Sequence, residues 1–166
     1  PDNTIKVNMG APIFEPSVVP ISAQELTKEY SVEGFSMGVL SMGNPHAIII
    51  SDSFNDSDIE SIGTKIQSAD FFPESANVGF MSVVNRGEIN LRVYERGVGE
   101  TLACGSGACA AAVVANRKGL TDRNVNIHLD GGKLSIDWSG DGVWMTGPTA
   151  IVFKGTLSAE FLKALQ

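Results

Sequence analysis

The residue types best suited to chemistry in this 166-residue chain gather around one cysteine, Cys104. It stands between a charged, glycine-rich stretch at residues 94–101 and an alanine-rich run. The following Gly105-Ser106-Gly107 predicts that Cys104 lies at a helix N-terminus, with Ser106 as a candidate cap. Because unpaired helix amides stabilise anions, we expect the pKa of the Cys104 thiol to lie below its usual value of about 8.5. The amides of Gly105 and Ser106 could also hold a substrate carboxylate.

Several kinds of cysteine site can be compared with this spacing. A phosphatase loop requires arginine after five intervening residues, where Ala110 stands. A thioredoxin-like pair and a local disulfide are excluded, because Cys109 lies about 140° around the helix from Cys104, and Cys109 is predicted to be core. A zinc site needs converging ligands, whereas His46 and His128 are isolated. A cysteine hydrolase with His46 as its base remains open, and so does a merely buried cysteine.

The surrounding pattern is rich in predicted strands. Alternating and β-branched segments predict strands at 39–51 (broken by a turn at 43–45), 78–84, 89–94, 125–129, 134–138 and 143–146. Helical periodicity and capping residues predict helices at 59–66 (after the cap candidates 56–58), 106–118 and 158–165.

The helix expected at 106–118 differs from the other two, because its side chains are apolar on every side from Ala108 to Ala115. Such a helix must be buried all round. We therefore predict an α+β fold in a single main domain. A curled, mostly antiparallel sheet or barrel wraps around this buried central helix.

Composition limits the possible partners. The net charge of −7 argues against a nucleic-acid surface, which requires basic patches. No apolar run reaches the length of about 18 residues that a membrane helix needs. The chain has two cysteines, too few for a dense disulfide framework, which favours a reduced, cytoplasmic compartment. The start at Pro1 is neither a signal peptide nor an initiator, so we expect the chain to have been processed or cut.

Four motifs, in this order and spacing, carry a resemblance to a known family. They are "MGNPHA" (42–47), "ANVGF" (76–80), "YERGVGET" (94–101) and "ACGSGACA" (103–110), and residues 7–16 and 147–155 add to them. The chain closely resembles diaminopimelate epimerases, but only the C-terminal half of their two-domain subunit. The resemblance implies that residues 1–155 form the C-terminal catalytic domain. Residues 156–166 would form a helix that packs on an N-terminal domain absent from this chain.

The resemblance also implies an activity. The family inverts the α-carbon of LL-2,6-diaminopimelate to give the meso form, a precursor of lysine and peptidoglycan, without pyridoxal phosphate or metal. Two cysteines act on opposite faces of that carbon, and Cys104 matches the C-terminal one. Glu95 and His46 match residues that tune the two thiols, with His46 reaching toward the absent cysteine. We therefore expect the isolated chain to be inactive.

Further positions match residues that bind substrate or join subunits. The implied substrate contacts are Asn44, Asn77, Glu95, Arg96 and the amides of Gly105 and Ser106. Phe153 stands where many family members carry a tyrosine at the contact of a homodimer. The homodimer is implied for the full-length protein.

Other interpretations remain open. Taken singly, Asn44 before a proline is typical of a turn, and Arg96 beside Glu95 is typical of a surface charge pair. Proline racemases and phenazine-type isomerases are rivals within the same superfamily. Arg96 favours diaminopimelate, whose distal ammonium and carboxylate groups need polar partners. A cysteine acyl-transfer enzyme using Cys104 and His46, or a non-catalytic binding module, is the alternative from another class.

Overall fold

A single sheet forms the framework of the protein. The computed structural model describes residues 3–52 and 54–164, and within them ten strands join this sheet. The strands are β1 (Thr4–Asn8), β2 (Tyr30–Val32), β3 (Phe35–Ser41), β4 (Pro45–Ile50), β5 (Asn77–Asn85), β6 (Glu88–Glu95), β7 (Gly99–Thr101), β8 (Asn124–Leu129), β9 (Gly132–Asp137) and β10 (Trp144–Pro148). The helices are α1 (Asp56–Gln67), α2 (Gly105–Arg117) and α3 (Ala159–Lys163).

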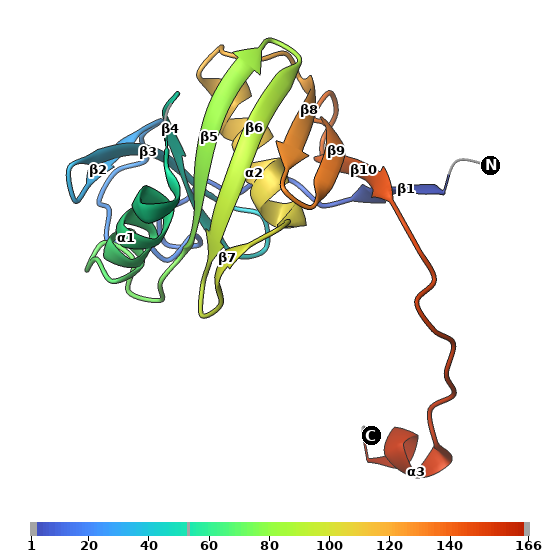
Figure 1. Cartoon of the computed structure of the whole chain (residues 1–166). Helices are drawn as coiled ribbons and strands as arrows, with labels where there is room; N and C mark the ends of the chain where they lie inside the picture. The colour runs from blue at the N-terminus through green and yellow to red at the C-terminus, as the bar shows by residue number, and fades with distance from the viewer. Residues whose placement is uncertain (1–2, 53, 165–166) are drawn as a thin grey trace.

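The sheet is mostly antiparallel and curls around α2. Its strands follow the order β1-β10-β9-β8-β6-β5-β4-β3-β2, with β7 paired to β6. Among the described strands, the parallel pairs are β4 with β5 and β6 with β8. Helix α2 contacts strands along most of this path, from β3 to β10 (Figure 1). The predicted α+β class and wrapped helix are confirmed. The described strands leave the sheet open, with edges at β1 and β2, so it is not a closed barrel.

Helix α2 is buried along its whole central part, as its composition predicts. Every residue from Gly107 to Ala115 is buried, and Cys109 has no exposed surface. Side chains of several strands, including Leu40, Ile48 and Leu91, pack around it in one core cluster. The prediction that Cys109 is a core residue is confirmed.

Helix α1 covers the opposite face of the sheet, where Ile59 and Ile66 enter a second core cluster. It begins three residues earlier than expected, and the cap candidates at 56–58 are wrong. Asn55 is the cap: its side chain accepts a hydrogen bond from the Asp58 amide at 3.0 Å. The Asp58 carboxylate accepts one from the Asn55 amide at 3.1 Å, which completes a capping box. Apolar periodicity misses this first turn because its side chains are mostly exposed.

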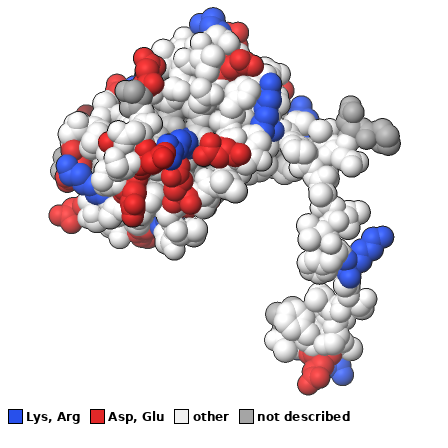
Figure 2. Space-filling model, in the orientation of Figure 1, with Lys and Arg blue, Asp and Glu red and all other residues white. Residues whose placement is uncertain are grey.

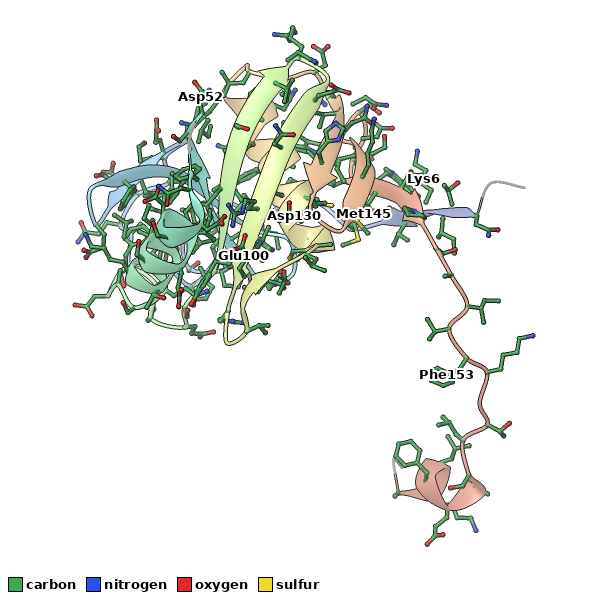
Figure 3. All side chains as sticks on the ribbon, viewed as in Figure 1. Lys6, Asp52, Glu100, Asp130, Met145 and Phe153 are labelled. Carbon is green, nitrogen blue, oxygen red and sulfur yellow. The ribbon has the colours of Figure 1, made fainter. Side chains whose placement is uncertain are left out.

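The C-terminal part of the chain leaves the main body as an extended segment that ends in α3 (Figure 1). Ser158 caps α3, and every residue of this helix is exposed. Of the predicted helix at 158–165, residues 159–163 are helical, while Leu165 lies outside the described residues. Phe153 lies on the extended segment and is 83% exposed (Figure 3). None of the helices in the described ranges has the length and apolar character that a membrane span requires.

Acidic side chains gather on the face of the molecule that carries β6 and β7 (Figure 2). Arg92 of β6 pairs there with Asp56 at 2.9 Å and with Glu100 at 2.6 Å. This ion-pair group lies on the side of β6 that faces away from α2. The acidic character of this face agrees with the net charge of the whole chain, which is −7.

Candidate active site

Cys104 lies directly at the start of α2. It is itself the N-cap residue, in extended conformation, and its side chain makes no capping hydrogen bond. The prediction that Ser106 caps the helix is therefore wrong, because Ser106 lies inside the first turn, with its hydroxyl 3.6 Å from the Cys104 sulfur. A Cβ atom at Gly107 would lie 3.2 Å from that sulfur and 3.2 Å from Cγ2 of Val93. Glycine at 107 thus lets the thiol pack closely against the helix start.

The pKa of the Cys104 thiol is raised above its ordinary value, contrary to our prediction. Burial is the main cause, because Cys104 is only 6% exposed and the thiolate loses hydration. Hydrogen bonds from the Ser106 hydroxyl and the Gly107 amide act in the opposite direction. The nearby Glu95 carboxylate raises the pKa further, both by its charge and by accepting a hydrogen bond from the thiol. Our prediction of a lowered pKa considered the helix amides, but it considered neither the burial of the thiol nor the Glu95 carboxylate.

A tight hairpin aims Glu95 at the thiol. Glu95 ends β6 and pairs with Gly99 of β7 across a turn in which Gly97 and Gly99 have φ values of 76° and 96°. Glycine adopts this left-handed conformation without steric cost. Alternation along β6 puts Glu95 on the same face as Val93, which packs in the α2 core. The Thr101 hydroxyl donates to Oε1 of Glu95 at 2.5 Å and holds the carboxylate in place.

Asn77 joins the two sequence segments that border the site. It is 3% exposed, and the parallel register of β4 and β5 places it opposite His46. Its Oδ1 accepts a hydrogen bond from the Arg96 amide at 3.0 Å, and its Nδ2 donates to the Pro45 carbonyl at 3.2 Å. Asn77 therefore fixes the start of β4 to the end of β6. Its role as a substrate contact stays a prediction.

An open hollow of 360 Å³ lies beside these segments. Asn44 and Arg96 line it together with Ser41 and Glu74. The Arg96 guanidinium is held by one hydrogen bond, from Nη1 to the Glu74 carbonyl at 2.8 Å. The Glu95 side chain is thus directed at the Cys104 thiol, and the next side chain, Arg96, lines the hollow.

His46 is fully buried, and burial lowers its pKa to about 4. Its Nε2 lies 3.0 Å from Oδ1 of Asn44, which requires the proton on Nε2 and leaves Nδ1 without a partner among the described residues. The polar groups around the Cys104 sulfur come from Ser106, Gly107 and Glu95. Within the described chain, no hydrogen bond joins His46 to Cys104, so a cysteine hydrolase built on this pair lacks its base.

Sequence reasoning missed two residues that support the site. Thr101 holds Glu95, and the two-residue alternation along the 94–101 hairpin could have revealed that their side chains share a face. Gln67, at the end of α1, donates from Nε2 to the Ala76 carbonyl at 3.0 Å and to the Tyr94 carbonyl at 3.2 Å. It thereby connects the residues just before Asn77 and Glu95. A single helix-end glutamine gives no sequence signal for such a contact.

We expect iodoacetamide to alkylate Cys104 faster than Cys109 at neutral pH. Burial raises the pKa of both thiols, but that of Cys109 rises to about 12, and Cys109 has no exposed surface. Since the thiolate is the reactive form, labelling of Cys104 should also accelerate as the pH increases from 7 to 9. Mass spectrometry after limited reaction measures both sites. Preferential labelling of Cys109 would contradict the arrangement described for α2.

We expect the stability of the protein to fall between pH 7 and pH 5 through His46. The pKa is 6.5 in the unfolded reference and about 4 when buried, so the unfolded chain binds the proton first as the pH falls. The stabilisation is complete above the unfolded pKa and decreases by about 2 kcal/mol at pH 5. Urea unfolding at both pH values measures the difference. His46→Gln should make the difference in unfolding free energy between the two pH values smaller by about 2 kcal/mol. His128→Gln should leave that difference unchanged, because the His128 side chain is 40% exposed.

A comparison with known protein families shows which family contains this arrangement of residues. The family model for diaminopimelate epimerase matches residues 38–152, which contain Asn77, Glu95 and Cys104. The chain belongs to this family. The match includes all of α2 and the strands from β4 to β10.

Curated relatives within the family are longer than this chain. The diaminopimelate epimerase of Vesicomyosocius okutanii is 45% identical over 93% of this chain and 57% of its own length. That of Alkalilimnicola ehrlichii is 48% identical over 96% of this chain and 59% of its own length. The chain therefore spans less than three fifths of these relatives.

Solved structures confirm the fold class. A hydroxyproline epimerase from Agrobacterium vitis aligns with a TM-score of 0.60 over 88% of this chain and 50% of that chain, at 12% identity. A predicted epimerase from Pseudomonas aeruginosa aligns with a TM-score of 0.54 over 91% of this chain and 59% of that chain, at 17% identity. Sequence identities this low support the fold alone.

Proposed function

We propose that this chain is the C-terminal catalytic part of an enzyme that converts LL-2,6-diaminopimelate to meso-diaminopimelate. In this proposal residues 1–155 form the domain that carries Cys104. Residues 156–166 pack on an N-terminal domain of the same enzyme. Family membership and the 57–59% coverage of the curated relatives support this division. The exposed extended segment and α3, with Phe153 83% exposed, fit an element that packs against another unit.

The observation that carries the proposal is the placement of the Cys104 thiol beside Glu95 at the start of α2. An α-proton is a very weak acid, so its removal requires donors that stabilise the charge developing on the adjacent carboxylate. The amides of Gly105 and Ser106 at the N-terminus of α2 are suited to that carboxylate. A substrate held there has its α-carbon next to the thiol.

Inversion requires that a proton leaves one face of the α-carbon and another arrives on the opposite face. The raised pKa keeps Cys104 protonated at neutral pH, which suits the group that donates the proton. An opposing thiolate removes the first proton, so the carbanion is quenched by the Cys104 thiol and Cys104 becomes the thiolate. Cys109 cannot be the second thiol, because it is fully buried in the core. We therefore place the second cysteine in the N-terminal domain.

The hollow beside Arg96 suits the distal end of the substrate. Diaminopimelate carries a second amino-acid group, and Arg96 and the side chain of Asn44 offer polar contacts there. Asn77 positions Arg96 through its backbone amide and is proposed to contact substrate with its remaining N–H. We also propose that the full-length enzyme forms a homodimer through Phe153. We further propose a cytoplasmic location, because both cysteines are free and a reducing compartment keeps thiols free.

Substrate selectivity of the complete enzyme tests this proposal. The chain, joined to a family N-terminal domain, should epimerise LL-diaminopimelate and leave L-proline and trans-4-hydroxy-L-proline unchanged. Arg96→Gln should raise the KM for diaminopimelate by about tenfold, because one charged contact to the distal group is lost. Racemisation of proline with no turnover of diaminopimelate would overturn the assignment of substrate.

A further inference from the structure

A second hollow, with a volume of 560 Å³, lies at the end of α2 opposite to Cys104. The 13 residues of α2 separate the two ends by about 20 Å. Lys28 and Glu29 line the hollow from the segment before β2, and Arg117 and Lys118 line it from the end of α2. Its volume falls within the range of about 300–1,000 Å³ that is typical of small-molecule sites.

The charges around this hollow leave an excess of positive charge. Glu29 is already compensated, because Lys118 lies 2.7 Å from its Oε1 and the Ser36 hydroxyl donates to the same oxygen. These contacts lower the pKa of Glu29, so it stays ionised. Lys28 and Arg117 have no acidic partner among the described residues. Two uncompensated cations therefore meet in a protein whose net charge is −7.

Arg117 differs from every other arginine of the chain. Arg86 and Arg92 donate to carboxylates, and Arg96 and Arg123 donate to carbonyl oxygens. Arg117 has no hydrogen-bond acceptor within the described residues, although its side chain is half-buried.

Its guanidinium stacks on the ring of Phe14, with Cζ 3.8 Å from the ring centroid. Stacking holds the guanidinium plane and leaves its N–H edge unsatisfied. Burial lowers the pKa of Arg117, and nearby Tyr30 acts in the opposite direction. A helix C-terminus also favours a cation, but this effect requires neither burial nor the lack of an acceptor.

We propose that this hollow binds a small organic dianion that carries its charge on a phosphate or on two carboxylates. The Arg117 fork binds one group bidentately, and Lys28 supplies the second charge. Ile50 and Leu120, which also line the hollow, contact the apolar part of the ligand. This site lies apart from Cys104, so the inference does not depend on the proposed epimerase activity.

Titration of the ¹⁵N-labelled chain followed by NMR tests the inference. Inorganic phosphate and succinate serve as separate probes, with acetate as a singly charged control, all at one ionic strength. We expect at least one dianion to cause saturable shifts confined to the amides of residues 28–36 and 117–120. Whichever of phosphate and succinate binds more tightly identifies the group that the site prefers. Acetate should bind about tenfold more weakly.

Matched variants make the result specific. Arg117→Gln and Lys28→Gln should each weaken binding of the preferred dianion by about tenfold. Arg123→Gln is the control, because Arg123 also lies over an aromatic ring, that of Trp138, but outside the hollow. Lys28 is exposed, so its replacement keeps the test valid even if Arg117→Gln impairs folding. The absence of saturable shifts with both dianions, or unchanged binding in Lys28→Gln, would overturn the inference.

Discussion

Replacement of Cys104 with alanine is expected to slow the conversion of LL- to meso-diaminopimelate about 1,000-fold or more when the chain is joined to a family N-terminal domain. The Cys104 thiol is proposed to be the group that transfers the proton on one face of the α-carbon. Without it, inversion has no acid on that face, and water must replace a preorganised donor. The appearance of deuterium from heavy water in the inverted meso product, followed by NMR, measures the rate.

Cys109→Ala is the matched control, because it removes the other thiol of the same helix. Cys109 is fully buried and its pKa is raised to about 12, so it takes no part in proton transfer. We expect conversion to the meso form to persist while the free energy of unfolding falls by about 1 kcal/mol through the small cavity. Conversion to the meso form that survives Cys104→Ala at more than a tenth of the original rate would contradict the assigned role.

Replacement of Glu95 with glutamine is expected to lower the pKa of Cys104 and to slow conversion to the meso form about 100-fold. The Glu95 carboxylate raises that pKa by its charge and by accepting a hydrogen bond from the thiol. Glutamine removes the charge, so the thiolate becomes more favourable and alkylation of Cys104 begins at lower pH. The proton donor is depleted and loses its orientation. The pH dependence of alkylation and the rate of deuterium incorporation measure the two effects.

Glu100→Gln provides the control on the same hairpin. The Glu100 carboxylate binds Arg92 at 2.6 Å on the outer face, where Figure 3 labels it. Its loss should leave both the alkylation profile of Cys104 and the exchange rate near those of the unaltered protein. An alkylation profile of Glu95→Gln that also stays unchanged would show that Glu95 does not tune the thiol.

Much of the fold was predictable because its strongest sequence patterns are compatible with only one arrangement of the chain. A helix with apolar side chains on all sides, such as Ala108–Ala115, requires a surrounding sheet. Alternation predicted strands on both sides of residues 86–87 and of residues 139–142, and these strands pair as β5 with β6 and β9 with β10. Strand β1 was missed although its five residues, Thr4–Asn8, alternate between polar and apolar; all of them are exposed. Strands β2 and β7, with three residues each, are too short to show a period.

The sequence indicated which residues lie near one another around Cys104, but not the electrostatic environment of the thiol. Motif spacing suggested that Cys104 and Glu95 share one site, and in the structure the Glu95 carboxylate acts on the pKa of the Cys104 thiol. The direction of the Cys104 pKa shift was wrong, because the sequence shows the helix start but not how deeply the sulfur is buried. The long-range support of Asn77 and Gln67 depends on the register of distant strands and on the end of α1. A single sequence contains neither piece of information.

The central claim is that this chain carries one half of a two-thiol site. Exchange of the diaminopimelate α-proton by the 166-residue chain, measured alone and after addition of a family N-terminal domain, tests it most directly. Alone, the chain should exchange no proton above the background rate, because it lacks the opposing thiol and its donors act in open solvent. With the added domain, exchange and conversion to the meso form should both appear, and the conversion should disappear again in Cys104→Ala. Rapid exchange by the isolated chain would contradict the account.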